Sequence, residues 1–518
     1  MRPLVLCRAA ALFAPGLLLL AFAPVSLGAS FFISPSGKDT NRCTNQATDA
    51  CATFPRCAAV MAAGDTCFAL DGTYLVTDTD PASPRMGWVF RSPGGTRTAR
   101  KRFTSLSQDA RKVTIKSATP RTQNTYYLLG AASSNQSDYL EFDHLTFEGR
   151  MEGGENLDGF TYHHNVAKCP NIGTGGGNQA PIYLQEMNRE MHKDIHIYNN
   201  LFLMDSSCDL PPSNVQFIVA FSFNGAIIEN NDFVNLTSKP MFAFVYLKRA
   251  NKDTVVRYNW FKGFKGDPLG VWLMDCNGDS SLNEFGDRSD QGGSPDCNNK
   301  VYQNLFVGIS SGAQCRSESG RHEWIYNNTV VDPGTRCLGV DSHIPGSGDG
   351  YQIFNNLCYG RAVPSDGHVT VPPYGNSSDV CMAEQAYFDN NLYWPAPTGS
   401  AAWKDCRIDT NGDGQADGDQ LYSTLADWKA HLASSGMERF STVEDPLFVA
   451  PSRHDFRLQP ASPARTGGRG GAWPSARGAY VSGYESIGCT FDSRCHAYPT
   501  DVPPGPPAPM NVVRSDAY

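Results

Sequence analysis

The stretch DTNGDGQADGDQ, from Asp409 to Gln420, places oxygen-bearing side chains at alternate positions, with Gly414 at the sixth. The candidate ligands are Asp409, Asn411, Asp413, Gln415 and Asp417. This is the spacing of an EF-hand-type calcium loop, in which carboxylate and amide oxygens surround a hard cation. Gln420 replaces the usual glutamate at position twelve, although Asp419 could contribute a ligand. We expect a structural calcium site; the alternative is a hydrated Asp/Gly turn.

A second acidic stretch, DCNGDSSLNEFGD, begins at Asp275 and has Asn277 and Asp279 at the same initial spacing. It lacks a glycine at the sixth position. A calcium ion there could bridge to an acidic sugar. Because Cys276 and Cys297 bracket the stretch, the alternative is a surface loop closed by a disulfide.

These loops interrupt a chain that repeats itself. Segments such as IHIYNNLF (Ile195–Phe202) and WIYNNTV (Trp324–Val330) place β-branched or aromatic residues before asparagine and apolar residues after it. The repeated asparagines are Asn200, Asn231, Asn259, Asn304, Asn328, Asn356 and Asn391. Their intervals run from 24 to 45 residues. The shortest fits one coil of a parallel β-helix, and the longer ones fit coils with inserted loops.

A second series of strand-like runs precedes most of these asparagines. It includes PIYLQE (Pro181–Glu186), QFIVAFS (Gln216–Ser222), FAFVYLK (Phe242–Lys248), GVWLMD (Gly270–Asp275), GAQCR (Gly312–Arg316) and CLGVDS (Cys337–Ser342). Asparagine suits the corner between strands because it tolerates left-handed backbone angles and because stacked amides can hydrogen-bond along the axis. A β-sandwich would show turns every 8–12 residues, and a propeller would show longer periods. We therefore expect an all-β, single-stranded parallel β-helix with an N-terminal cap and loop insertions; the resemblance described next implies that it is right-handed.

The chain resembles the right-handed parallel β-helix, pectate-lyase-like superfamily of secreted carbohydrate-active proteins. The opening FFISPSGKDTNRC (Phe31–Cys43) and AAGDTCFALDGTY (Ala62–Tyr74) are similar to the entry segment of such proteins. The segment from Leu425 to Ala464, in which DPLF precedes DFRL and SPA, resembles their C-terminal coils. The superfamily holds lyases, glycosidases, esterases, epimerases and non-catalytic proteins, so the resemblance implies the fold and leaves the reaction open.

The resemblance implies that a glycan would bind along the sheet formed by the second series of runs. Alternation predicts that Tyr246, Lys248 and Trp272 point outward, where exposed rings beside an amine could form a sugar-stacking platform with a base. Further substrate-binding candidates lie on or just after equivalent runs: Asp275, Asp341 and His343.

β-Elimination of a uronic acid needs a base and a group that neutralises the carboxylate. Lys248 would serve as the base, and Arg316 or Arg249 would neutralise the carboxylate. Some β-helix lyases have an arginine about one coil after the lysine, but Leu269 and Trp272 occupy that region here. The alternative for Lys248 is a solvated lysine on a solenoid surface.

Two other functions stay open. A glycoside hydrolase would need two carboxylates about 5–9.5 Å apart. Asp275 and Asp341 would be two coils apart, at roughly 10 Å, which is near that limit. The third possibility is a non-catalytic surface or glycan-binding protein. Reading the chain as a lyase, we expect a polysaccharide substrate and a monomer.

The rest of the sequence fits an exported protein. Arg2 and Arg8 with the apolar run Ala9–Ala23 are typical of a secretory signal, and the run is too short for a membrane span. The chain holds 16 cysteines, of which Cys7 lies in the signal, and most of the others should form disulfides outside the cell or in the periplasm. The net charge of −9 argues against general nucleic-acid binding.

The expected organisation follows. Residues 1–28 form the signal peptide, and residues 29–495 form the β-helix domain. Within that domain, residues 29–75 cap the N-terminal end, which protects the first strand from edge pairing, and residues 405–420 carry the calcium-loop insertion. Residues 496–518 form a Pro-rich disordered tail.

Overall fold

The computed structural model describes residues 28–77, 86–118, 126–129, 137–153, 157–169, 178–184, 192–208, 214–237, 239–248, 251–263, 269–274, 297–317, 323–334, 336–342, 351–360, 369–371, 386–394, 403–408, 418–434 and 436–496. Residues 1–27 of the predicted signal peptide, the calcium-loop residues 409–417 and residues 497–518 of the tail lie outside these ranges.

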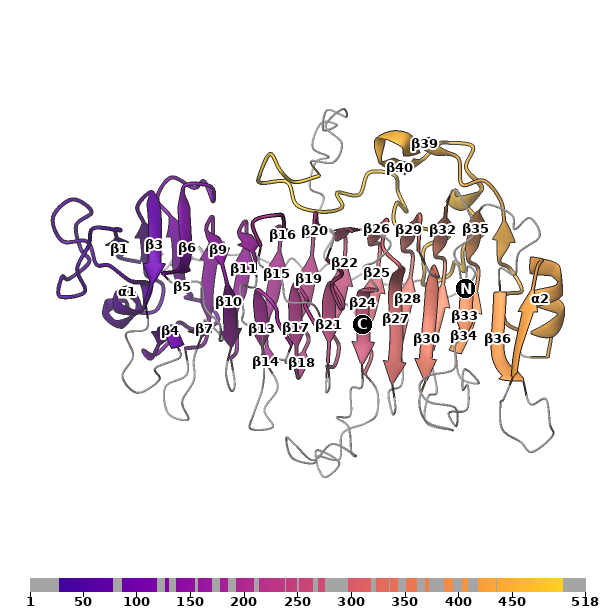
Figure 1. Ribbon diagram of the computed structural model, residues 1–518, viewed down its shortest axis with the longest axis horizontal. Helices are drawn as coiled ribbons and strands as arrows, with labels where there is room; N and C mark the ends of the chain where they lie inside the picture. The colour runs from indigo at the N-terminus through magenta and orange to yellow at the C-terminus, as the bar shows by residue number, and fades with distance from the viewer. Residues whose placement is uncertain are drawn as a thin grey trace, which may run out of the picture.

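Three long sheets run along the molecule, and successive coils add a strand to each (Figure 1). Sheet A contains, in spatial order, β1 (Ser30–Ile33), β2 (Thr66–Ala69), β5 (Lys101–Ser105), β8 (Leu140–Asp143), β11 (Thr161–His163), β15 (His196–Tyr198), β19 (Ile227–Glu229), β22 (Val255–Arg257), β25 (Lys300–Tyr302), β28 (Glu323–Tyr326), β31 (Tyr351–Phe354) and β34 (Ala386–Asp389). Sheet B contains β3 (Gly72–Val76), β6 (Val113–Ser117), β9 (Thr146–Glu148), β12 (Val166–Lys168), β16 (Leu201–Met204), β20 (Asp232–Asn235), β23 (Trp260–Lys262), β26 (Leu305–Val307), β29 (Thr329–Val331), β32 (Leu357–Tyr359), β35 (Leu392–Trp394) and β38 (Thr442–Val443).

Sheet C contains β4 (Met86–Phe90), β7 (Tyr126–Leu129), β10 (Arg150–Gly153), β13 (Ile182–Leu184), β17 (Ile218–Ala220), β21 (Val245–Leu247), β24 (Leu269–Met274), β27 (Ser311–Ser317), β30 (Leu338–Ser342), β33 (Val369–Val371), β36 (Trp403–Ile408) and β37 (Gly418–Tyr422). Only the β36–β37 pair of the described strands in these three sheets is antiparallel. Apart from the end pairs β1–β2, β35–β38 and β36–β37, neighbours within a sheet are separated along the chain by strands of the other two sheets, which confirms the predicted parallel β-helix. A short extra pair, β14 (His192–Lys193) with β18 (Phe223–Asn224), lies between sheets C and A in the chain.

The core fills the space that the three sheets enclose. Sheet B shows how the repeated sequence builds it, because the residue two places after each ladder asparagine points inward. Phe202, Phe233, Phe261 and Phe306 occupy this position on four consecutive coils, and their rings stack with centroids 4.6–4.8 Å apart. All four side chains are fully buried. The strand spacing and the ring spacing therefore match, and the apolar residue after each corner is what joins one coil to the next.

The corner between sheets A and B carries a ladder of buried asparagines. The backbone N–H of each asparagine but the last donates to the side-chain oxygen of the asparagine one coil further on, as in Asn200 to Asn231 and Asn231 to Asn259, both at 3.0 Å. We call this the asparagine ladder: Asn165, Asn200, Asn231, Asn259, Asn304, Asn328, Asn356 and Asn391. The prediction that stacked amides hydrogen-bond along the axis is confirmed.

The left-handed turn, however, falls on the residue before each ladder asparagine. Asn199, Asn230 and Tyr258 have φ of 51°, 52° and 56°. We call this set the corner row: His144, His164, Asn199, Asn230, Tyr258, Gln303, Asn327, Asn355 and Asn390. The expectation that one asparagine does both tasks was wrong, because the ladder side chain must point into the turn while its neighbour bends the backbone.

Short helices lie near the two ends of the stack. Helix α1 (Phe54–Val60) begins at Thr53, whose side chain accepts a hydrogen bond from the Arg56 amide, and Phe54 packs edge-on against Phe103 at 5.3 Å. Helix α2 (Leu425–His431) begins at Thr424 in the same way. In the described residues no helix is long and apolar enough to cross a membrane.

After β38 the chain leaves the coils. Strands β39 (Phe448–Ala450) and β40 (Asp455–Leu458) form an antiparallel hairpin outside the three sheets, with the 3-10 turn η3 (Pro451–Arg453) between the strands and the 3-10 turn η4 (Pro463–Arg465) after β40. The resemblance had suggested further coils over this stretch. Residues 466–496, here called the C-terminal strap, then run back along the molecule (Figure 1). The hairpin and strap cover the outer face of sheet B, where Phe448, Phe456 and Leu458 pack with residues such as Leu357.

Five disulfides have both partners in the described residues: Cys43–Cys51, Cys57–Cys67, Cys169–Cys208, Cys337–Cys358 and Cys489–Cys495. Cys297 is also disulfide-bonded. The prediction that most cysteines after the signal form disulfides fits this set.

Candidate functional site

Tyr246 and Trp272 are paired one coil apart on the outer face of sheet C. Their chain neighbours Leu247 and Leu273 belong to the main core, so the alternation predicted from sequence holds. The rings of Tyr246 and Trp272 stack at 5.1 Å with 21° between their planes. Phe242 packs against both rings, at 5.4 and 4.8 Å.

These rings are nevertheless not an exposed platform. Tyr246 is 4% exposed and Trp272 is 7% exposed. They belong to an outer apolar cluster that also holds Tyr183, Val219 and Phe221. The expectation of open stacking surfaces was wrong because the sequence pattern gives the direction of a side chain and not what lies on top of it.

Lys248 follows β21 directly and is partly buried. Its ammonium nitrogen lies 5.5 Å from the ring centroid of Phe221 and 5.7 Å from that of Tyr246. The aromatic cluster therefore lies beside the ammonium group and can stabilise it by cation–π attraction.

The strand register places Lys248 and Arg316 in one row. Leu247 pairs with Leu273, so Lys248 is in line with Met274; Met274 pairs with Arg316, and Arg316 with Asp341. With coils about 4.8 Å apart, the backbones of Lys248 and Arg316 are roughly 10 Å apart. For Arg316 and Asp341 the structure describes the backbone position. Arg249, Asp275 and His343 lie outside the described residues.

A second group on this face was missed from the sequence. The guanidinium carbon of Arg150 lies 3.7 Å from the ring centroid of Tyr183, and its nitrogen lies 3.1 Å from the Glu152 carboxylate. Burial raises the pKa of Glu152, and the charge of Arg150 opposes that shift. The sequence feature that could have indicated this pair is the stretch RME, in which a basic and an acidic residue flank Met151 and a glycine follows.

The outer face of sheet A carries a continuous row of polar and aromatic side chains, also missed. At its upstream end Arg102 donates two hydrogen bonds to Asp143, at 2.6 and 2.9 Å, and His163 Nε2 lies 3.3 Å from Glu141. Although burial opposes it, hydrogen bonds from His144, Arg102 and Thr104 hold the pKa of Asp143 well below its usual range.

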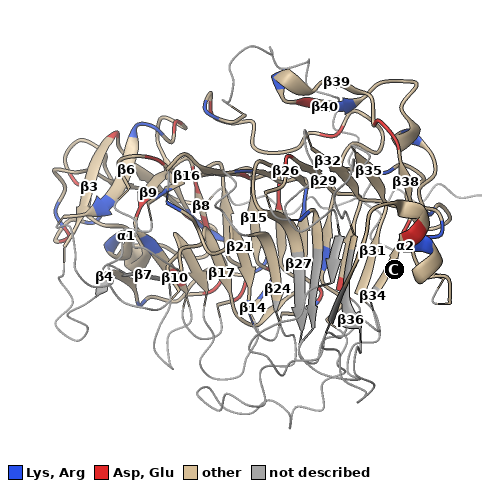
Figure 2. Cartoon of the chain, turned by 45° about the vertical axis from the view of Figure 1, so that its right-hand side comes forward, with Lys and Arg blue, Asp and Glu red and all other residues tan. Residues whose placement is uncertain are grey.

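The row continues through Glu229, which lies 2.9 Å from His196 Nε2 and accepts a hydrogen bond from Arg257 at 2.7 Å. Arg257 in turn donates to the Tyr302 hydroxyl at 2.8 Å. Almost every charge in this row has an opposite charge beside it, so the row ties coils together more than it offers free ligand groups. Figure 2 likewise shows acidic and basic residues interspersed along the described coils.

Three groups of potential metal ligands occur in the described chain. Two of them contain the disulfides Cys169–Cys208 and Cys489–Cys495, whose sulfurs are already bonded. The third is Glu141, Asp143 and His163, where the Arg102 guanidinium occupies both oxygens of Asp143. None of these groups offers the open set of anionic oxygens that calcium requires.

Of the predicted calcium loop, the structure describes only the residues at its two ends. Strands β36 and β37 pair antiparallel, with Ile408 opposite Gly418, so residues 409–417 connect two adjacent strand ends. Asp419 and Gln420 lie in β37, where Gln420 pairs with Asp405.

The connections between sheets distinguish the three faces. Two residues, Asn199 and Asn200, connect β15 to β16 across the A–B corner. Residues 275–299 connect β24 to β25 on one side of sheet C, and residues 205–217 connect β16 to β17 on its other side. Sheet B is covered by the hairpin and strap, and the outer side chains of sheet A pair with one another, whereas the longest of these connections adjoin sheet C.

No family model and no curated protein matches the chain. Among solved structures it is similar to pectate lyase Pel9A, with 11% identity, 88% of this chain and 97% of that chain covered, and a TM-score of 0.42. It is similar to a rhamnogalacturonan lyase at 11% identity, covering 80% and 100%, with a TM-score of 0.36. It is also similar to a mannuronic-acid-specific family 6 polysaccharide lyase from human gut microbiota, at 12% identity, covering 70% and 80%, with a TM-score of 0.38. At these values the fold assignment rests on the strand order, which agrees with the pectate-lyase-like β-helix suggested by the sequence.

Proposed function

We propose that this protein is a secreted polysaccharide lyase that cleaves a uronic-acid-containing glycan by β-elimination on the outer face of sheet C. The supporting observation is the register row in which Lys248, Met274 and Arg316 follow one another on consecutive coils. In this register a base and a cation would share one face, with their backbones roughly 10 Å apart across two coils.

The chemistry assigns one task to each residue. The neutral amine of Lys248 removes the proton on the carbon next to the uronate carboxylate. The electron pair forms a carbon–carbon double bond as the glycosidic carbon–oxygen bond breaks. The departing oxygen takes up a proton from the ammonium now on Lys248 or from water. Arg316, or Arg249 just after Lys248, pairs with the carboxylate and stabilises the developing negative charge.

The outer aromatic cluster has a supporting role in this proposal. Tyr246 and Trp272 are buried, so they hold the base in position and exclude water beneath it rather than stack on the sugar. Asp341, next to Arg316 in the register, would orient that arginine, and His343 and Asp275 would reach the glycan from the adjoining connections. A calcium ion, when bound at residues 409–417, would hold that acidic loop in place.

The test begins with the purified protein and three acidic polysaccharides: pectate, alginate and a glycosaminoglycan, each with calcium and with a chelator. A lyase produces unsaturated uronate ends, which are detected by ultraviolet absorbance. We expect Lys248→Met to lower kcat by about 10²–10⁴-fold and Arg316→Ala to cause a similar loss. Lys300→Met, which removes an outward lysine from sheet A, is the matched control and should keep full activity.

The outcomes separate the alternatives. Release of reducing ends without absorbance would replace the lyase proposal by a hydrolase. Binding without any cleavage would identify a glycan-binding protein. A lyase whose activity survives Lys248→Met would retain the function but overturn the assignment of its base.

A further inference from the structure

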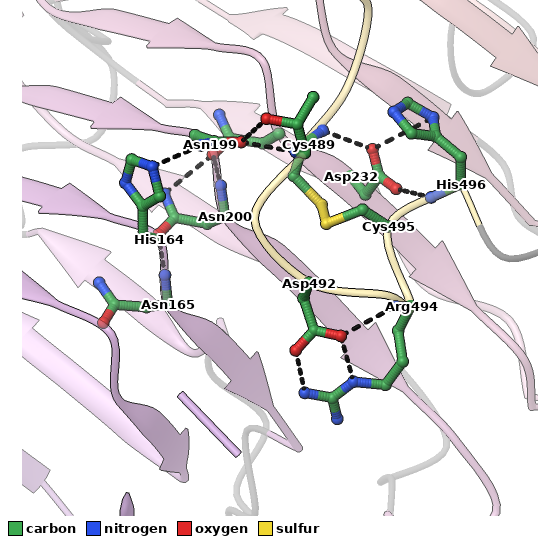
Figure 3. The surroundings of a disulfide bond; sticks show 12 residues. His164, Asn165, Asn199, Asn200, Asp232, Cys489, Asp492, Arg494, Cys495 and His496 are labelled. Carbon is green, nitrogen blue, oxygen red and sulfur yellow. Dashed lines mark hydrogen bonds and ion pairs between the residues drawn. A yellow bond between two sulfur atoms is a disulfide. The ribbon is translucent and has the colours of Figure 1, made fainter. Parts of the chain in front are cut away.

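A chain of hydrogen bonds ties the C-terminal strap to sheet A through two histidines. The backbone N–H of Thr490 donates to Asn199 Oδ1 at 2.7 Å, and Asn199 Nδ2 lies 2.7 Å from His164 Nε2 (Figure 3). His164 Nδ1 lies 2.8 Å from His163 Nδ1, and His163 Nε2 lies 3.3 Å from Glu141 Oε1. The chain thus crosses from the strap through the corner row to strands β11 and β8.

Only one arrangement of protons satisfies all four links. Asn199 accepts from Thr490 with its oxygen, so its amide NH₂ must donate to His164 Nε2. With Nε2 accepting, the neutral His164 carries its proton on Nδ1 and donates to His163 Nδ1. His163 then carries its proton on Nε2 and donates to the Glu141 carboxylate. Both histidines must be neutral for the chain to be complete.

A single added proton reverses this order. A protonated His163 has N–H groups on both nitrogens, so its Nδ1 can no longer accept from His164. His164 would then have to move its proton to Nε2, which would face the NH₂ of Asn199. To accept there, Asn199 would have to rotate its amide, and Thr490 would lose its acceptor. A proton taken up by His164 itself has the same effect at Asn199 directly.

The strap has further links at this end. Asn230 Nδ2 donates to the Ser486 carbonyl at 2.6 Å, and the Gly488 N–H donates to the Tyr258 carbonyl at 2.7 Å. The Phe491 ring packs edge-on to His164 at 5.6 Å. The buried carboxylate of Asp232 accepts from the amides of Cys489 and His496, at 2.9 and 2.6 Å (Figure 3). Beneath the strap, Cys489 packs in a small apolar cluster with residues of sheet B such as Val166 and Leu201.

Charged and titratable groups surround the two histidines from each element packed against them. They are Arg102 on β5, Glu141 and Asp143 on β8, His144 in the corner row, His196 and Tyr198 on β15, and the Asp492–Arg494 pair on the strap. Burial, His163, His144 and Arg102 oppose a proton on His164, whereas Asp143 favours one.

We propose that residues 486–496 form a pH-sensitive latch, which is closed while His163 and His164 are neutral and opens as the pH falls. Opening breaks the Thr490–Asn199 contact and exposes the apolar cluster of sheet B under Cys489.

The direction of this pH dependence follows from the protonation equilibrium of His164. Burial, together with the neighbouring His163 and His144, lowers the pKa of His164 to about 4. An exposed histidine titrates near 6.5, so the open state takes up more protons between these values. The closed state is therefore favoured above about pH 6.5 and loses stability as the pH falls toward 4. If opening restores the ordinary pKa of His164, the equilibrium constant for opening increases by roughly one to two orders of magnitude from pH 7 to pH 4.5.

Hydrogen exchange of the full chain, corrected for intrinsic rates, tests the latch. We expect the Thr490 amide to lose protection on acidification while the Asn304 amide of the ladder keeps it. His164→Gln should remove this pH dependence, because Gln303 already occupies the corner row with the same backbone turn and a glutamine oxygen can accept from Asn199. His196→Gln, which changes a histidine of sheet A outside the chain, should keep it.

Equal protection of Thr490 at both pH values in the native protein would overturn the latch. So would an unchanged loss of protection in His164→Gln. A parallel loss at Asn304 would also overturn it, since the whole β-helix would then be opening rather than the strap.

Discussion

The A–B corner and the outer face of sheet C are built by opposite means. The corner is crossed in two residues per coil, and its side chains hydrogen-bond in a fixed order from Asn165 to Asn391. The face of sheet C adjoins connections as long as residues 275–299, and its outer row changes from Tyr246 and Trp272 to Gln314 and Gly339 in successive coils.

The difference shows which part of a β-helix is free to vary. A corner that repeats a hydrogen bond in every coil cannot accept an insertion without breaking the ladder, so it supplies stability. Sheet C meets its neighbours through connections that can lengthen without disturbing the stack. The connections that adjoin sheet C are therefore the part that can vary, and damage to the corner should affect stability first.

The largest expected effect is at the ladder. Asn304→Ala removes the acceptor for the Asn259 amide and the donors to Val256, Tyr302 and Asn328, all at 2.8–3.1 Å. Several buried polar groups lose their partner, so we expect the free energy of unfolding to fall by about 3–5 kcal/mol. Chemical denaturation of the purified variant measures this. A loss below about 1 kcal/mol would show that water or a shifted coil replaces the amide.

The end of the same corner should respond to pH. Asn391 donates to the Ser441 hydroxyl at 2.8 Å, and the nearby Glu438 is buried and accepts from the Tyr393 hydroxyl at 2.7 Å. Burial raises the pKa of Glu438 to about 7, well above its ordinary value of 4.5. Its contribution to stability is thus complete below about pH 4.5 and is lost as the pH rises through 7.

Glu438→Gln isolates this contribution. From pH 5 to pH 8 the free energy of unfolding of the native protein should fall by about 3 kcal/mol relative to that of the variant. The glutamine amide still offers Tyr393 an acceptor but cannot ionise. Thermal unfolding at several pH values checks the difference. Parallel curves for the two proteins would mean that Glu438 is ionised at no cost in the folded state.

These residues also show how far sequence reasoning could go. The repeated asparagines predicted the stack because hydrogen bonds between coils demand the same residue at each corner. The division of labour between Asn199 and Asn200 could not be predicted, since both are asparagine and either could take a positive φ. The burial of Trp272 depends on Phe242, and the Thr490–Asn199 contact spans 291 residues, so neither leaves a local pattern.

The strap should matter less than the ladder and should not matter to sheet C. Cys489→Ser with Cys495→Ser opens a disulfide with a sequence separation of only 6, so we expect a loss of about 2 kcal/mol. Activity on any glycan that the native protein cleaves should be unchanged, because the strap covers sheet B. Chemical denaturation measures the change in the free energy of unfolding, and steady-state kinetics on the same preparation measure the activity. A large fall in kcat at full folding would place the strap within the functional site.

The smallest effect concerns the corner row, where two substitutions at one position separate the turn from the hydrogen bond. Asn230 has φ of 52° and its Nδ2 donates to the Ser486 carbonyl at 2.6 Å. Both Asn230→Gly and Asn230→Ala lose that hydrogen bond, but glycine accepts the left-handed backbone and alanine does not. We expect alanine to be less stable than glycine by about 1 kcal/mol. Equal unfolding free energies for the two variants would mean that the backbone at this corner can relax, and the corner row would then be held by the ladder alone.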